Sequence, residues 1–261
     1  GVLCFYAMPL LPFYTSNAYT PEVLKDAFLV GSSLTLLGLL WALLCAPSGK
    51  AVPSTRRDSL SLMVRSIVGN SPLIIYFLAY VCIGLSYGMW FGLLYFYLDS
   101  YLLLGDSMAL MFTVGTLVSM FSAPIWSSLV KKTSKQTTWG VGTILFVLQL
   151  IGMLFLDSTS DRWLAMVLIV MAFVSFAGHN IAPLAILGDI IDFGKLKFHQ
   201  DRGATYFAIN NLLYKIGLGL GSGLALAVAG MFDFDPAGES QSTMAILGLK
   251  LGFIYIPSLF L

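Results

Sequence analysis

Long apolar runs with almost no charge alternate along this sequence with short intervals that hold nearly all of its charged residues. Charged residues make up only 10% of the 261 residues and hydrophobic residues 58%, whereas roughly a quarter of a typical soluble domain is charged. An apolar run of about 20 residues can cross a bilayer as a helix, which satisfies its own backbone hydrogen bonds in lipid. The pattern therefore predicts an all-α, polytopic helical membrane protein.

Most of the apolar runs have the length of a complete membrane span. The complete spans are expected at Ala27–Ala46, Leu73–Leu98, Met108–Val130, Trp139–Leu156, Trp163–Leu187 and Ala204–Phe232. Residues 1–13 have the composition of the end of another span, and a further one begins near Thr243 and is cut off at Leu261. We therefore expect the sequence to be a piece of a longer protein. A short helix on the membrane surface is expected at 60–69, where apolar residues recur at helical spacing.

The loops alternate in charge along the chain. The basic loops hold Lys50, Arg56, Arg57 and Arg65, then Lys131, Lys132 and Lys135, then Lys195, Lys197 and Arg202. The loops between them hold Glu22 and Asp26, Asp99 and Asp106, Asp157 and Asp161, and Asp233, Asp235 and Glu239. Because loops rich in Lys and Arg stay in the cytoplasm, we expect the basic loops and the C-terminus on the cytoplasmic side, in the inner (plasma) membrane of a bacterium.

One cation, Lys215, lies deep inside an apolar run. It follows the start of its span by about 12 residues, or about 18 Å of helix, which is near the middle of a ~30 Å hydrocarbon core. Asn211 precedes it by one helical turn and lies on the same face, with Asn210 and Tyr214 on the flank. A charge at this depth costs several kcal/mol. Either Lys215 has only a structural role, neutralised by burial or with its side chain reaching an interface, or it lies in a water-filled cavity and serves a function.

A dense group of charges follows the apolar run that ends at Leu187. Asp189 and Asp192 are three residues apart, so they would share one face of a continuing helix. Lys195, Lys197, Asp201 and Arg202 follow. The group is either a solvated loop or an inner gate, whose ion pairs close the cytoplasmic mouth in one state and break in another. An exposed pair contributes at most about 1 kcal/mol, which is enough to bias two states of nearly equal free energy.

Three weaker patterns each allow a structural and a functional interpretation. His179, beside Asn180 and near Pro183, is either a packing histidine or a proton relay. The aromatic run at 87–97 (YGMWFGLLYFY) either packs between helices or stacks against a sugar ring. Glycines alternate through Gly217, Gly219, Gly221 and Gly223. Their spacing predicts two faces on which a neighbouring helix can approach closely and slide.

The segment 188–223 carries a recognisable set of motifs. It contains D-x-x-D-F-G-x-x-K at 189–197, Arg202 ten residues after the second aspartate, and an apolar run with Lys215 before a glycine-rich segment. This arrangement resembles the last cytoplasmic loop and eleventh helix of the glycoside–pentoside–hexuronide:cation symporters. The melibiose permeases belong to this branch of the major facilitator superfamily. The segment WSSLVKKTSKQTTWG at 126–140 is similar to the connection between helices eight and nine of the family.

The resemblance implies that this chain is the C-terminal part of a facilitator built from two six-helix halves. Residues 1–46 would be the end of the N-terminal bundle (helices five and six), and residues 47–71 the cytoplasmic central loop. Residues 72–261 would form the C-terminal bundle of helices seven to twelve, the last one cut off. The missing N-terminal half of the same protein is then a partner of this chain.

The resemblance also supports a functional role for the midplane cation, because family members carry a lysine at this position of helix eleven. The predicted substrate and cation cavity contains Lys215, Asn211, Asn210, Tyr214 and His179. The predicted cytoplasmic gate contains Asp189, Asp192 and Arg202. The acids that would bind the coupling cation are expected in the missing half.

We therefore expect a secondary active transporter that moves a sugar or glycoside by alternating access, in symport with Na⁺ or H⁺. A lipid or lysolipid carrier of the same fold is an alternative, which an open lateral apolar cleft would favour. A non-transporting membrane scaffold is another, but it gives no reason for a cation at Lys215. The sequence contains no phosphate-binding glycine loop, nucleophile triad, metal-ligand spacing or basic aromatic patch. We expect no enzyme activity, catalytic residue, cofactor, bound metal or nucleic-acid partner; the expected partners are a small solute and membrane lipid.

Overall fold

The computed structural model describes residues 2–12, 14, 19–46, 60–236, 238 and 241–261, and these residues form helices and connections without any strand. The α-helices are α1 (Val2–Ala7), α2 (Pro21–Cys45), α3 (Leu60–Val68), α4 (Ser71–Phe96), α5 (Met108–Lys132), α6 (Lys135–Leu154), α7 (Arg162–Phe198), α8 (Gly203–Met231), α9 (Thr243–Lys250) and α10 (Ile256–Leu259). Within these ranges, six helices are long and apolar enough to cross a membrane: α2 and α4 to α8. The all-α polytopic fold is confirmed. Lys50, Arg56 and Arg57 of the predicted central loop lie outside the described residues.

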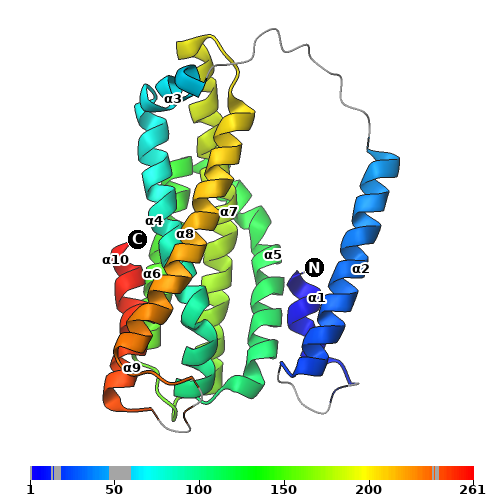
Figure 1. Cartoon of the computed structure of the whole chain (residues 1–261), viewed down its shortest axis with the longest axis vertical. Coiled ribbons are helices and arrows are strands. Elements are labelled where there is room, and N and C mark those ends of the chain that lie inside the picture. The colour runs from blue at the N-terminus through cyan, green and yellow to red at the C-terminus, as the bar shows by residue number, and fades with distance from the viewer. Residues whose placement is uncertain (1, 13, 15–18, 47–59, 237, 239–240) are drawn as a thin grey trace.

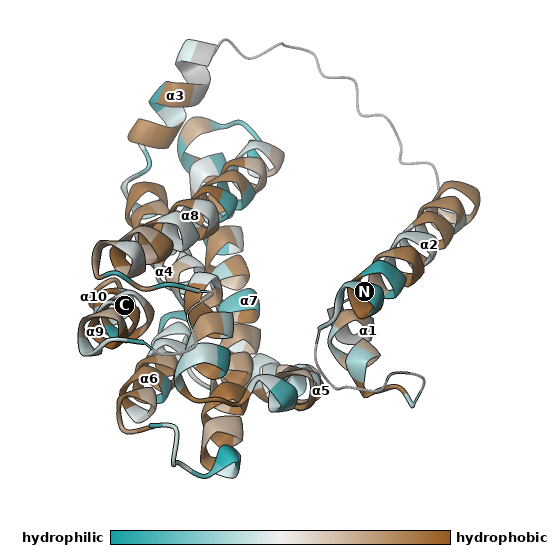
Figure 2. Cartoon of the chain, turned by 60° about the horizontal axis from the view of Figure 1, so that its bottom comes forward, coloured by the Kyte–Doolittle hydropathy of each residue, from teal (hydrophilic) through white to brown (hydrophobic). Residues whose placement is uncertain are grey.

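Helices α4 to α8 pack side by side as one bundle, with α9 and α10 against its outer side (Figure 1). The short α1 lies against α5, and α2 stands beyond α1, away from the other long helices (Figure 1). Hydrophobic residues cover most of the length of the long helices, and hydrophilic residues gather mainly near their ends (Figure 2). Large apolar side chains such as Leu44, which is 84% exposed, cover α2. Exposed apolar surface of this extent suits a lipid environment.

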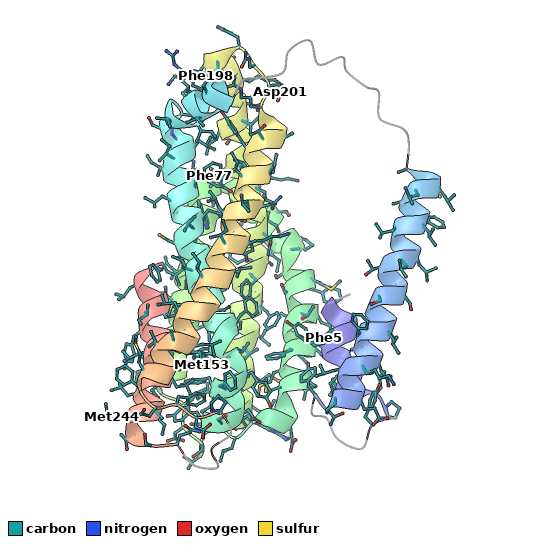
Figure 3. All side chains as sticks on the ribbon, in the orientation of Figure 1. Phe5, Phe77, Met153, Phe198, Asp201 and Met244 are labelled. Atoms are coloured by element: carbon teal, nitrogen blue, oxygen red, sulfur yellow. The ribbon has the colours of Figure 1, made fainter. Side chains whose placement is uncertain are left out.

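The loops sort to the two ends of the bundle by charge, as the sequence predicts. At one end, the Lys135 Nζ lies 2.6 Å from both carboxylate oxygens of Asp189, and Lys197 donates a hydrogen bond of 2.7 Å to the Gly69 carbonyl. At the other end, the Tyr101 hydroxyl donates to the Leu156 carbonyl over 3.1 Å. Phe198 and Asp201 lie at the first end and Met153 and Met244 near the second (Figure 3). That the basic end faces the cytoplasm remains a prediction from the positive-inside rule.

One prediction about the charged segment is wrong, because α7 does not end near Leu187. It continues to Phe198 and terminates where His199 adopts a left-handed conformation (φ 53°, ψ 30°). The extension is stabilised because its buried residues Ile190 and Gly194 pack against neighbouring helices, Gly194 close to Tyr206. Asp189 and Asp192 are therefore helical residues and not loop residues.

Helices α4 and α8 approach so closely that their backbones are in contact. A methyl group added at Gly88 would overlap the Leu218 carbonyl oxygen, and one at Gly221 the Leu85 carbonyl oxygen. The Ser222 hydroxyl donates a hydrogen bond of 2.8 Å to the Gly88 carbonyl across this contact. We call this contact the α4–α8 seam.

Only one of the two predicted glycine faces of α8 forms the seam. Gly217 and Gly221 are buried on it. A methyl group at Gly219 or Gly223 would meet no atom within 4 Å. The alternating pattern is the same for both pairs, so which face is used depends on where α4 packs.

Candidate functional site

An open cavity of about 510 Å³ lies between α1, α4, α5, α7 and α8, and we call it the central cavity. Its lining residues are Tyr6, Phe91, Thr116, Ser119, Met120, Ala123, Phe173, Phe176, Ala177, Asn180, Ile181 and Tyr214. Aromatic rings form much of this wall, and amide and hydroxyl groups supply its polarity. An apolar pocket with a few convergent polar groups is typical of a small-molecule site.

The aromatic run of α4 contributes only one residue to the central cavity. Phe91 is 40% exposed and stacks on Phe176 of α7, with ring centroids 5.0 Å apart and planes inclined by 23°. Tyr87, Trp90 and Tyr97 of the same run are fully buried among other aromatic rings. The packing interpretation of the run therefore holds for these three residues, whereas Phe91 lines the central cavity.

Asn180 is the amide of the cavity wall. It is exposed on α7, and its Nδ2 donates a hydrogen bond of 2.8 Å to the Phe176 carbonyl one turn earlier. The sequence pattern indicated a possible site role for His179, and Asn180 was noted only as its neighbour. Phe173, Phe176, Ala177, Asn180 and Ile181 recur at spacings of three and four residues. This helical periodicity is the signal that could have identified the face.

His179 is buried on the side of α7 away from this lining and fastens three helices together. Its Nδ1 lies 2.7 Å from the Tyr87 hydroxyl on α4, and its Nε2 lies 3.1 Å from the Thr143 hydroxyl on α6. The Thr143 hydroxyl also reaches the Trp139 carbonyl at 3.2 Å. The Nδ1 also lies 3.0 Å from the Ser175 carbonyl oxygen. Both ring nitrogens of a neutral imidazole are therefore paired, and its tautomer decides which of them donates.

The predicted set on α8 is divided between three environments. Tyr214 lines the central cavity. Asn210 is fully buried, and neither of its amide atoms forms a hydrogen bond with a described residue. Lys215 and Asn211 are both exposed on a face that does not line the cavity. Within the described part of the chain, Lys215 has no ion pair.

The predicted gate residues make their contacts within this bundle. Asp189 pairs with Lys135 of α6, and Asp201 pairs with Lys195 of α7 over 2.7 Å. The hydrogen bond from Lys195 holds the pKa of the Asp201 carboxyl below its usual value. Arg202 is buried and donates to Gln200. Asp192 is exposed and forms no ion pair with the residues that the structure describes.

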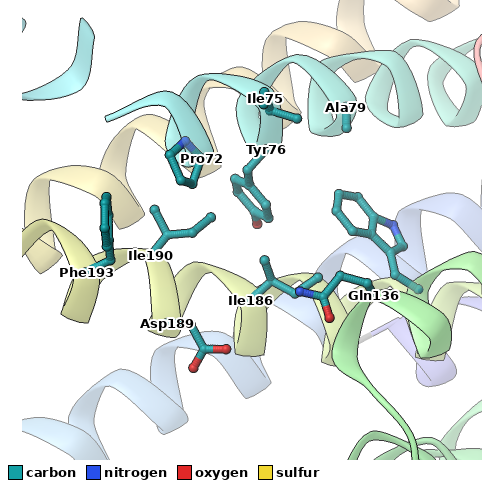
Figure 4. A pocket seen from close by; sticks show the side chains of 10 residues that line it. Pro72, Ile75, Tyr76, Ala79, Gln136, Ile186, Asp189, Ile190 and Phe193 are labelled. Carbon is teal, nitrogen blue, oxygen red and sulfur yellow. The ribbon is translucent and has the colours of Figure 1, made fainter. Parts of the chain in front are cut away.

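A second cavity of about 500 Å³ lies between α4, α6 and α7 near the basic end (Figure 4). Its walls are mainly apolar, and the Tyr76 ring projects from α4 into the middle of the view, with Asp189 at the rim (Figure 4). It shares no lining residue with the central cavity. We call it the lateral cavity.

Comparison with known proteins places these features in a family. Residues 1–261 match the family described as MFS/sugar transport protein. A curated protein of Bacillus subtilis (strain 168), the uncharacterized symporter YjmB, is 24% identical over 259 residues. The match covers 95% of this chain and 56% of that protein, so the chain spans about half the length of this relative. With six membrane-length helices in its described part and a family match over all its residues, this integral membrane protein belongs to the MFS/sugar transport protein family.

Proposed function

We propose that this chain forms one wall of a cation-coupled sugar symporter, which carries a sugar or glycoside with Na⁺ or H⁺ by alternating access. The observation that supports this most strongly is the central cavity. Its aromatic faces suit the apolar C–H faces of a sugar ring, and its amide and hydroxyl groups suit the ring hydroxyls. In facilitators of this architecture, the substrate site lies between two halves that rock against each other.

We assign coupling to the exposed face of α8 that carries Lys215 and Asn211. A midplane ammonium group exposed to lipid costs several kcal/mol, so this face is expected to meet polar groups in the assembled transporter. Acidic residues of a complementary N-terminal half would pair with Lys215 and bind the coupling cation. The remaining length of the relative is sufficient for such a half.

Asp189, Asp192 and Arg202 are proposed to control the cytoplasmic mouth. The pair between Asp189 and Lys135 joins the ends of α6 and α7, and the pair between Lys195 and Asp201 joins the end of α7 to the turn before α8. These contacts would set the shape of the mouth on this side of the transporter.

The lateral cavity is the one feature that favours a lipid or lysolipid carrier. Its apolar walls would accept an acyl chain. Aromatic rings lie between it and the central cavity: Tyr76, which is only 3% exposed, stacks on Tyr80 one turn later on α4 (centroids 5.5 Å apart), and Tyr80 contacts the cavity residue Tyr214 (5.3 Å). Transport of lipid by this route would require that aromatic pair to move.

The test is uptake into proteoliposomes that contain the complete transporter. Radiolabelled sugars and lysophosphatidylcholine are supplied with and without an inward gradient of Na⁺ or H⁺. We expect saturable sugar uptake that requires one of the two gradients. Gradient-driven lysolipid uptake without sugar uptake would replace this proposal with the lipid carrier.

A further inference from the structure

No Asp, Glu, Lys, Arg or His is among the residues that line the central cavity. Its polar members are Asn180, Thr116, Ser119 and the two tyrosines, Tyr6 and Tyr214. Lys215 lies outside the lining. A charged substrate would therefore meet no opposite charge on this wall.

The free hydrogen-bonding groups of the wall suit hydroxyl groups better than carboxylates. One N–H of the Asn180 amide is used by the Phe176 carbonyl, which leaves one N–H and the Oδ1 acceptor available. The Thr116 hydroxyl oxygen is buried and has no hydrogen-bond partner among the described residues. A sugar hydroxyl can donate to Asn180 Oδ1 and accept from either group, whereas a carboxylate only accepts.

The aromatic residues oppose an anion as well. The face of an aromatic ring carries the negative part of its quadrupole. Phe91 and Phe176 stack on each other and line the same wall as Asn180, so a carboxylate held there would lie against aromatic rings and an amide and not against a cation. Without a cation to compensate, its desolvation would be unfavourable.

We propose that this wall selects an uncharged, hydroxyl-bearing sugar over the corresponding uronic acid, and that Asn180 is the specificity-determining residue. The inference rests on the proposed sugar transport and extends it to a substrate class. Asn180 acts by direct contact with a ring hydroxyl, and Phe91 and Phe176 provide the surface on which the ring lies.

The experiment measures how well each probe competes with a radiolabelled sugar for binding to, and uptake by, the complete transporter in proteoliposomes. The probes are the matched pairs glucose and glucuronate, and galactose and galacturonate. In the best-bound pair, we expect the neutral sugar to compete at a concentration at least about tenfold lower than its uronic acid. The reason is that a site that hydrogen-bonds a hydroxyl rejects analogues that leave its polar groups unpaired.

Two variants and a control assign the preference to Asn180. Asn180→Leu should weaken binding of the neutral sugar about tenfold, as expected for loss of about one hydrogen bond. Asn180→Lys should narrow or invert the ratio of the competing concentrations of neutral sugar and uronic acid, because it supplies a cation to the cavity wall. Leu184→Ala, one turn later on α7 and outside the cavity lining, should change neither value. Since Asn180 and Leu184 are both exposed, all three proteins should remain folded, which size-exclusion chromatography checks.

The outcomes separate this inference from the proposed function. If no probe of either class binds or is transported, sugar transport itself is wrong. If the uronic acids bind as well as or better than the neutral sugars, or if both Asn180 variants keep the parental ratio, sugar transport stands and the assignment of Asn180 is overturned.

Discussion

Lys215 is the residue on which the proposed coupling depends. It is exposed near the middle of α8, on the same face as Asn211. We predict that Lys215→Ala in the complete transporter abolishes cation-driven accumulation of sugar while expression falls little. The reason is that the variant removes the charge that would pair with the cation-binding acids, and also removes a desolvation cost from the membrane interior.

Accumulation under an imposed cation gradient, normalised to the amount of protein in the vesicles, measures this effect. Lys131→Ala, at an exposed position in the last turn of α5, is the matched control and should retain parental uptake. Accumulation by the Lys215 variant equal to that of the control would show that the midplane cation has no role in coupling.

His179 gives a prediction of a different kind, because its hydrogen bonds account for both ring nitrogens. Tyr87→Phe removes one of these bonds in a fully buried position and should destabilise the protein by about 1 kcal/mol. Tyr255→Phe, at a half-exposed tyrosine, should be neutral. Thermal denaturation in detergent is the measurement.

The pH dependence of transport then tests the relay interpretation of His179. A neutral histidine held between Tyr87 and Thr143 has no free nitrogen to exchange a proton with the central cavity. We therefore expect His179→Gln to lower stability but to leave the pH profile of uptake unchanged. Loss of one limb of that profile in this variant would restore the proton relay.

Which residues belong to the site could be predicted only in part. Lys215 is conspicuous in the sequence because a charge in an apolar run is costly. Asn180 is not, because an amide beside a histidine is compatible with either a buried or an open position. Whether a helical residue faces the cavity depends on the rotation of its helix against its neighbours. That rotation is set by tertiary contacts such as the bonds of His179, which hydropathy does not contain.

At the scale of elements, the α4–α8 seam provides the sharpest comparison. We predict that Gly88→Ala or Gly221→Ala destabilises the protein by about 1–3 kcal/mol, because the new methyl group overlaps a backbone carbonyl of the facing helix. Gly219→Ala and Gly223→Ala, on the open face of α8, should cost nothing measurable. Denaturation temperatures of the four variants decide the matter, and equal values in all four would contradict the close packing of this seam.

The contact between α6 and α7 gives a prediction about the gate. Asp189→Asn removes the partner of Lys135, and we expect the cytoplasmic mouth to shift towards inward-facing states. Both side chains are partly exposed (32% for Lys135 and 62% for Asp189), so the effect on stability should stay below about 1 kcal/mol. Labelling of a Ser119→Cys reporter in the central cavity by a reagent applied from the cytoplasm measures the shift.

A charge exchange is the control for this pair. Lys135→Asp combined with Asp189→Lys should restore the parental labelling rate if the pair itself sets the equilibrium. Asp192→Asn, which removes an exposed carboxylate without an ion pair in the described structure, should shift the rate less. Equal labelling of Asp189→Asn and the parent would leave only a solvated charged surface.

The limits of α7 show why element boundaries are harder to predict than element identity. Hydropathy predicted a span up to Leu187, because the apolar run ends there, whereas α7 ends at Phe198. The helix continues because Ile190 and Gly194 are buried against other elements, and a helix needs no apolar run once it has left the bilayer. The presence of each long helix is thus a local property of the sequence, whereas the end of α7 is a tertiary one.

At the scale of the whole molecule, the sorting of the loops was predictable because it follows from the parity of the spans. That the transport pathway is divided between this chain and a second half remains an expectation from the sequence. The central cavity opens among α1, α4, α5, α7 and α8, and Lys215 lies exposed beside it on α8. Neither this polar face nor the open cavity wall has a counterpart in the described structure. One half of an alternating-access transporter requires such an arrangement.

The most direct test of this account compares residues 1–261 alone with the same chain co-expressed with a complementary N-terminal half, as split membrane proteins can reassemble from preformed helices. The measurement is cation-dependent sugar uptake into vesicles that contain equal amounts of this chain. We predict no uptake above that of protein-free vesicles for the chain alone, and saturable, gradient-driven uptake when the other half is present. Robust saturable uptake by residues 1–261 alone would show that this bundle builds the whole pathway by itself, and would contradict the account.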